Sequence, residues 1–132
     1  MNIDYNEIYN NLCKYIGKRE ISPFVTIGSF ACALITINGN VYYGVNFQAK
    51  CALSNCAEKN AIANALLNNE NQFVQAMIVY RNGSLSEPCG CCKELFMQLT
   101  PKNGDMQIIT NISPLMSKKL SDCKNWWGNN IV

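Results

Sequence analysis

Two short stretches, Cys56-Ala57-Glu58 and Pro88-Cys89-Gly90-Cys91-Cys92, contain the residue types of a metal site. Cys56 stands alone, whereas Cys89 and Cys92 are three residues apart, the separation that brings two side chains to one face of a helix. A metal ion that takes part in a reaction has three protein ligands and a fourth position open to water. Glu58 follows the first ligand candidate closely, so that its carboxylate could handle the protons of that water. The pattern therefore predicts a catalytic zinc site with these three cysteines as ligands.

Both stretches lie at the expected starts of helices. Apolar residues recur with helical spacing after Asn55, and a second helical pattern opens at Cys89 and stops before Pro101. Ser54 or Asn55 is the expected N-cap of the first of these helices. The first turn of a helix has unpaired backbone N–H groups and a partial positive charge, which stabilise thiolates. These helix ends would offset part of the negative charge that three thiolates leave on a zinc ion.

The remaining pattern predicts an alternation of strands and helices. Two apolar runs, 30–37 and 41–45, are separated by Asn38-Gly39, which is the strongest short signal for a β-hairpin. Strands that alternate with helices after an initial hairpin imply a mixed sheet with helices on its faces. The expected helices span 3–16, 55–69, 89–99 and 114–120, and the expected strands span 30–37, 41–45, 73–80 and 106–110.

Length and composition indicate one globular domain over residues 1–132. The sequence is 48% hydrophobic and 15% charged, and it has no apolar run long enough to cross a membrane. Its net charge of +2 is not gathered into a basic stripe, so we expect no nucleic-acid partner. The polar start has no basic region followed by an apolar one, which predicts no secretion signal and a cytoplasmic location.

The eight cysteines leave other interpretations open. The ligand candidates could be buried, inert thiols, or they could hold a structural zinc with Cys51 or Cys91 as a fourth ligand. The Cys-x-x-Cys spacing also fits a redox dithiol, although that would not explain the distant Cys-Ala-Glu. We leave Cys91 out of the ligand set because it is rotated away from the face of Cys89 and Cys92. A purely structural zinc site has no need for Glu58, so this carboxylate favours the enzyme.

From about Phe30 to Leu99 the chain resembles the cytidine deaminase family, including its blasticidin S deaminase branch. The resemblance implies a three-layer α/β/α sandwich with a mixed five-stranded sheet, Zn²⁺ as cofactor, and hydrolytic removal of the 4-amino group of a cytosine nucleoside. Glu58 would take a proton from the water and return it to the ring nitrogen and the leaving amine. A homotetramer with active sites at subunit interfaces is also implied. The matching segments are 33–34, 38–42, 44–46, 56–58 and 86–92.

The resemblance also assigns residues around the substrate. Asn46 matches the asparagine that holds the ribose, and backbone groups around Ala57 and Pro88 are expected to orient the base. Gln48 stands where nucleoside deaminases have a glutamate, which removes a charged acceptor for a sugar hydroxyl. A modified nucleoside of the blasticidin S kind is therefore the alternative to cytidine or deoxycytidine.

Several further positions extend the match or depart from the family. Lys59 and Lys93 match arginines beside the ligands, and we expect them to donate to ligand sulfur. The aromatic residue that stacks on the base would align with position 28 or 29, Gly28 or Ser29, although Phe30 and Phe24 are close. The tail, with Trp126-Trp127, is similar to the blasticidin S branch, which has a tryptophan near its C-terminus.

Overall fold

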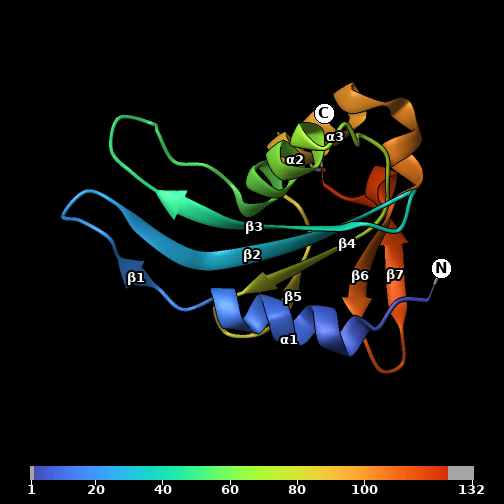
Figure 1. Ribbon diagram of the computed structural model, residues 1–132, viewed down its shortest axis with the longest axis horizontal. Coiled ribbons are helices and arrows are strands. Elements are labelled where there is room, and N and C mark those ends of the chain that lie inside the picture. Colours follow the sequence, from blue (N-terminus) through green and yellow to red (C-terminus); the bar gives the residue numbers. More distant parts are fainter. Residues whose placement is uncertain (1, 125–132) are drawn as a thin grey trace.

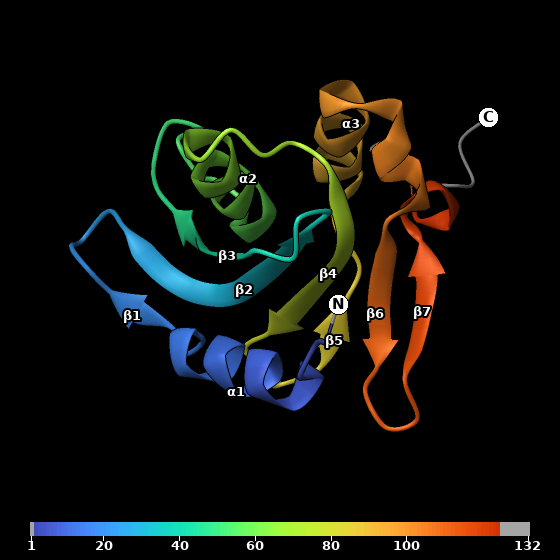
Figure 2. The same cartoon turned by 45° about the vertical axis from the view of Figure 1, so that its right-hand side comes forward.

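The computed structural model describes residues 2–124, in which a β-sheet lies between helices on both faces (Figure 1). One face is covered by α1 (Tyr5–Tyr15), and the other by α2 (Ala57–Leu67) and α3 (Gly90–Leu99). Figure 2 shows the same separation of the helices from a second direction. The predicted three-layer α/β/α architecture is therefore confirmed. No helix in the described part of the chain has the length and apolarity that a membrane span requires.

Within residues 2–124 the sheet contains seven strands and is mixed. The longer strands run in the order β3-β2-β4-β6-β7, with β4 and β6 parallel and the other neighbours antiparallel. The predicted count of five differs because β1 and β5 are two-residue strands, too short to show a periodic pattern, that pair with β2 and β4. The strands are β1 (Arg19–Glu20), β2 (Thr26–Thr36), β3 (Val41–Gln48), β4 (Phe73–Tyr80), β5 (Leu85–Ser86), β6 (Gln107–Asn111) and β7 (Met116–Lys119).

The predicted hairpin between β2 and β3 is confirmed, but β2 begins earlier than the sequence indicated. The predicted strand began at Phe30, whereas β2 begins at Thr26 and passes through a β-bulge between Ile27 and Ala31. Gly28 permits this because its φ of +96° is a conformation that other residues rarely adopt. A methyl group at Gly28 would also collide with the backbone of Gly17. The extension brings the start of β2 beside the end of β3.

The predicted helix over 114–120 is wrong. Residues 116–119 form β7, which pairs antiparallel with β6, and only Leu120–Asp122 forms a short 3-10 helix, η2. The edge of β6 provides backbone hydrogen-bond partners, and Ser117 Oγ donates to Gln107 Oε1 across the two strands at 2.7 Å. These contacts between strands outweigh the weak local preference of the segment.

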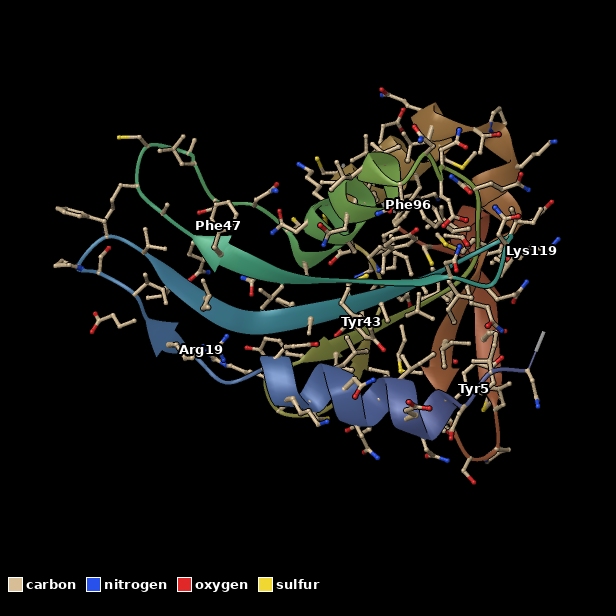
Figure 3. The ribbon with its side chains drawn as sticks, viewed as in Figure 1. Tyr5, Arg19, Tyr43, Phe47, Phe96 and Lys119 are labelled. Atoms are coloured by element: carbon tan, nitrogen blue, oxygen red, sulfur yellow. The ribbon has the colours of Figure 1, made fainter. Side chains whose placement is uncertain are left out.

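Two hydrophobic clusters hold the layers together. Ile8 and Leu12 of α1 pack against one face of the sheet, and Tyr43 of β3 points to the same side, toward α1 (Figure 3). The larger cluster lies between the other face and α2 and α3, and it includes Phe73 and Phe96, whose rings meet edge to face at 5.7 Å. This second cluster includes Ala57 and Cys92, so it fixes the first turns of α2 and α3 against the sheet.

The position of α2 is fixed along β3 by a glycine and two asparagines. Gly44 lies so close to α2 that a methyl group there would collide with the backbone at Ala57 and Ala61. Asn60 and Asn64 donate their side-chain amides to main-chain carbonyls of β3, at 2.7 Å each. The N-terminal end of α2 is consequently held against β3, the strand that carries Asn46 and Gln48.

Candidate active site

The fold brings Cys56, Glu58, Cys89 and Cys92 together from the starts of two helices. Their ligand atoms all lie within 4.8 Å of one another. The sulfurs of Cys56 and Cys89 are 3.8 Å apart, and those of Cys89 and Cys92 are 3.2 Å apart. The arrangement that the spacing predicted is thus present in the structure.

Cysteines cap both helices, a position that serine, threonine and aspartate more often fill. Cys56 is the N-cap of α2 and makes no side-chain capping bond, whereas the sulfur of Cys89, the N-cap of α3, accepts from Cys92 N–H at 3.3 Å. The expected cap, Ser54 or Asn55, lies outside the helix: Ser54 binds the backbone of Ala49, and Asn55 pairs with β3. The thiol groups therefore face the positive ends of the helix dipoles.

The donor set fits a zinc ion. Two thiolates at about 2.3 Å from one tetrahedral ion lie about 3.8 Å apart, which is the separation of Cys56 and Cys89. Hydrogen bonding with Cys56 and Cys92 lowers the pKa of Cys89 to about 2, and hydrogen bonding with Cys89 raises the pKa of Cys56 to about 11. Hydrogen bonding to both neighbours also raises the pKa of Cys92. Three sulfurs this close compete for protons, and a divalent cation would stabilise all of them as thiolates.

No fourth cysteine belongs to the cluster in the part of the chain that the structure describes. Cys51 and Cys91 are exposed and lie outside it, and none of the eight cysteines is in a disulfide. The closed site with four thiolates is thus not formed among the described residues. The fourth member of the cluster is the carboxylate of Glu58.

Glu58 is buried beside the sulfurs. Only 5% of the residue is exposed, and Oε2 accepts a long hydrogen bond of 3.5 Å from Cys89 N–H. Burial is the main cause that raises the pKa of this carboxyl group. A carboxyl group in this environment can both accept and return a proton.

A cavity of about 310 Å³ opens onto the cluster, a size at the lower end for small-molecule sites. It lies between the end of β3, where Figure 3 shows Phe47, and the starts of α2 and α3. Sequence reasoning missed three of its wall residues, Phe47, Ile78 and Glu87, since nothing local in the sequence marks them. Beside the cluster the walls include Phe30, Asn46, Phe47, Gln48, Ile78 and Glu87.

Three residues at one end of the cavity are fixed by hydrogen bonds or ring contacts. Asn46 is buried, and its Oδ1 accepts from Phe30 N–H at 2.8 Å. Gln48 is exposed, and its Oε1 accepts from the Thr26 hydroxyl at 3.3 Å. The ring of Phe30 packs on that of Tyr80 with centroids 4.8 Å apart. Because Phe30 lines the cavity, it supplies the aromatic wall that positions 28 and 29 lack.

The other predicted site residues are placed as follows. Ala57 lines the cavity, and Pro88 is buried between two lining residues.

The two predicted lysines lie beside the ligand segments. Lys59 interacts with the thiol of Cys91, which raises the lysine pKa. Lys93 Nζ donates to backbone carbonyls of the C-terminal segment rather than lying in the cavity wall. Phe24 is 66% exposed and Trp126-Trp127 lie outside the described residues.

Comparisons with known proteins agree with this geometry. Residues 12–106 match the family model for the cytidine and deoxycytidylate deaminase zinc-binding region. A cytidine deaminase of Halalkalibacterium halodurans is 31% identical over 88 residues, which span 59% of this chain and 67% of that protein. The cytidine deaminase of Mycoplasma pneumoniae is 28% identical over 97 residues, 71% of each chain. The crystal structure of cytidine deaminase from Mycobacterium tuberculosis has the same fold, with a TM-score of 0.71, 19% identity, and coverage of 92% of this chain and 94% of that chain.

Proposed function

Because this chain belongs to the cytidine and deoxycytidylate deaminase family, a group of zinc-binding hydrolases, we propose that it converts cytidine or deoxycytidine to the uracil nucleoside with release of ammonia. The enzyme class is that of zinc-dependent nucleoside deaminases. The observation that carries the proposal is the cluster of Cys56, Glu58, Cys89 and Cys92 at the base of the cavity.

We propose that Cys56, Cys89 and Cys92 hold the zinc ion and that Glu58 moves protons. Zinc at such a site activates water for attack on an electrophilic ring carbon. Glu58 accepts a proton from the attacking water and delivers it to the ring nitrogen, and it then takes the second proton of the same water oxygen and delivers it to the amine, which leaves as ammonia. Its burial keeps bulk water from competing for that proton. Backbone groups at Ala57 and Pro88 orient the base beside this carboxylate.

The walls support the binding of a base and a sugar. The Phe30 ring offers an apolar surface on which a pyrimidine can stack, and Asn46 lies next to it with a fixed amide. Gln48, at the same end, can hydrogen-bond a sugar hydroxyl but carries no charge. This neutral side chain favours one second candidate substrate, a modified cytosine nucleoside such as blasticidin S, over an unmodified ribonucleoside.

We also propose a cytoplasmic homotetramer. Two exposed apolar segments project at one end of the molecule, the turn before β2 with Ile21 and Phe24 and the loop after β3 with Leu53 (Figure 1). Each of these side chains is more than 60% exposed, and contact between subunits would cover them. Eight free cysteines suit a reducing compartment. Light scattering of the zinc-loaded protein tests the assembly.

A substrate panel tests the proposed reaction. The zinc-loaded protein is incubated separately with cytidine, deoxycytidine, cytosine and blasticidin S, and ammonia release and ultraviolet absorbance are followed. Turnover of cytidine or deoxycytidine is the expected result. Turnover of blasticidin S alone would move the enzyme to the second candidate, and no turnover of any of the four would contradict the proposal.

A further inference from the structure

The segment that carries Cys89 and Cys92, two of the proposed ligands, is attached at both of its ends to one other segment of the chain. We name residues 87–93 the ligand turn and residues 116–123, which comprise β7 and η2, the C-terminal strap. Before the ligands, Glu87 forms an ion pair with Lys118 of the strap, with Nζ and Oε2 3.0 Å apart. This contact fixes the residue that precedes Pro88.

The second contact lies immediately after the last ligand. Lys93 Nζ donates to the carbonyl oxygens of Ser121 and Cys123 in the C-terminal strap, at 3.1 and 2.6 Å. Lys93 follows Cys92 directly, and its own N–H donates to Cys89 O at 2.9 Å. The ligand turn is thus attached to the strap at its first and last residues, with both sulfur ligands between the two attachments.

The C-terminal strap is itself firmly attached to the body of the protein. β7 pairs with β6, and Leu120 N–H donates to Met106 O at 2.9 Å. Leu120 and Cys123 are buried, with 0% and 2% of each residue exposed. Figures 1 and 2 show the segment after β7 on the same side of the sheet as α3. The strap can therefore act as a rigid support for the ligand turn.

We infer that the C-terminal strap is a clasp that keeps the ligand turn in the shape that zinc requires, with Lys93 and Lys118 as positioning residues. The inference rests on the proposed ligands Cys89 and Cys92. Loss of a clasp contact lets the ligand turn open locally more often, and zinc escapes from the open form. Ligands that are held in place before binding also bind more tightly, because less ordering is required when the metal enters.

The rate of zinc loss tests the clasp. The full-length, zinc-loaded protein is mixed with excess chromogenic chelator, and zinc transfer is followed for the wild type and for Lys93→Met, Lys118→Met and Lys119→Met. Lys119 is the matched control, because it neighbours Lys118 in β7 but faces Asp105 at 3.7 Å, away from the ligand turn. We expect about a tenfold faster loss for Lys93→Met, which removes two charged hydrogen bonds, and up to about fivefold for Lys118→Met. Lys119→Met should match the wild type.

Cobalt substitution separates a positioning role from a general loss of stability. The thiolate-to-cobalt absorption bands should change in Lys93→Met and stay unchanged in Lys119→Met. In the zinc-loss assay, Lys93→Arg should retain zinc nearly as well as the wild type, because arginine keeps the N–H donors and the charge. Equal rates for Lys93→Arg and Lys93→Met would overturn the inference, as would a Lys118→Met rate equal to that of Lys119→Met. The surface variant Lys118→Met keeps the test decisive if Lys93→Met does not fold. A wild type that holds no zinc would overturn the ligand assignment and the clasp together, whereas equal rates in all variants overturn the clasp alone.

Discussion

Replacing Gly44 by alanine should move α2 and thereby impair the proposed zinc site. A methyl group at residue 44 would lie 2.9 Å from the carbonyl carbon of Asn60 and closer still to the backbone at Ala57 and Ala61. Ordinary contact begins at 3.4 Å, so relief of the Asn60 contact alone needs a shift of 0.5 Å (3.4 − 2.9), and the closer contacts need more. Because these neighbours are backbone atoms, no side-chain rotation can absorb the change.

We expect Gly44→Ala to lower the free energy of unfolding by about 3 kcal/mol, or about 1.5 M in the urea midpoint at a slope of about 2 kcal/mol per M. Since Cys56 and Glu58 lie at the start of α2, the shift should also reduce kcat/KM by about 100-fold. Urea unfolding and steady-state deamination of cytidine measure the two effects. Gly104→Ala is the control, because its nearest neighbour is the flexible end of Met97 at 3.3 Å and it should cost less than about 1 kcal/mol. A Gly44→Ala protein with unchanged stability and activity would refute the reasoning.

Two other substitutions test the aromatic wall of the cavity and the hydrogen bonds that Glu70 accepts from the β2–β3 hairpin. Phe30→Ala should lower kcat/KM for cytidine by about 10- to 100-fold, the range for loss of a base–aromatic stack, while Leu67→Ala, at an 82% exposed residue outside the cavity, should have little effect in the same kinetic assay. Glu70 accepts hydrogen bonds from Tyr42, Asn38 and Asn40, and chiefly the Tyr42 bond lowers its pKa from 4.5 to about 2. Its stabilising effect is therefore present above pH 4.5 and is lost as the pH falls toward 2, so urea unfolding of the metal-free protein should show a weaker loss of stability in acid for Glu70→Gln. An identical pH dependence in the wild type and Glu70→Gln would contradict this assignment.

The sequence predicted which residues gather at the site better than it predicted the residues around them. The spacing of three puts Cys89 and Cys92 on one face of a helix, and the resemblance to the deaminase motif implied that Cys56 and Glu58 meet them, as they do in the structure. The pattern of apolar residues also predicted the three main helices and the hairpin. These features depend on neighbours within a few residues of each other in the sequence.

The features that sequence reasoning missed depend on contacts between distant segments. β7 contains no alternation of apolar and polar residues, and its strand form comes from pairing with β6. The hydrogen bonds of Lys93 to carbonyl groups of Ser121 and Cys123 have no signal in the sequence around Lys93. Phe47 and Glu87 line the cavity only because the end of β3 and the turn before α3 meet there. Such partners are decided by the packing of the sheet and helices.

The most direct test of the account compares zinc content and cytidine turnover in the same samples of wild type and Glu58→Gln. The amide keeps the size of the side chain but cannot take up the proton. We predict about one zinc ion per chain in both proteins, turnover by the wild type, and at least a 100-fold lower rate for Glu58→Gln. A Glu58→Gln protein that deaminates cytidine at the wild-type rate would contradict the proposed role of Glu58.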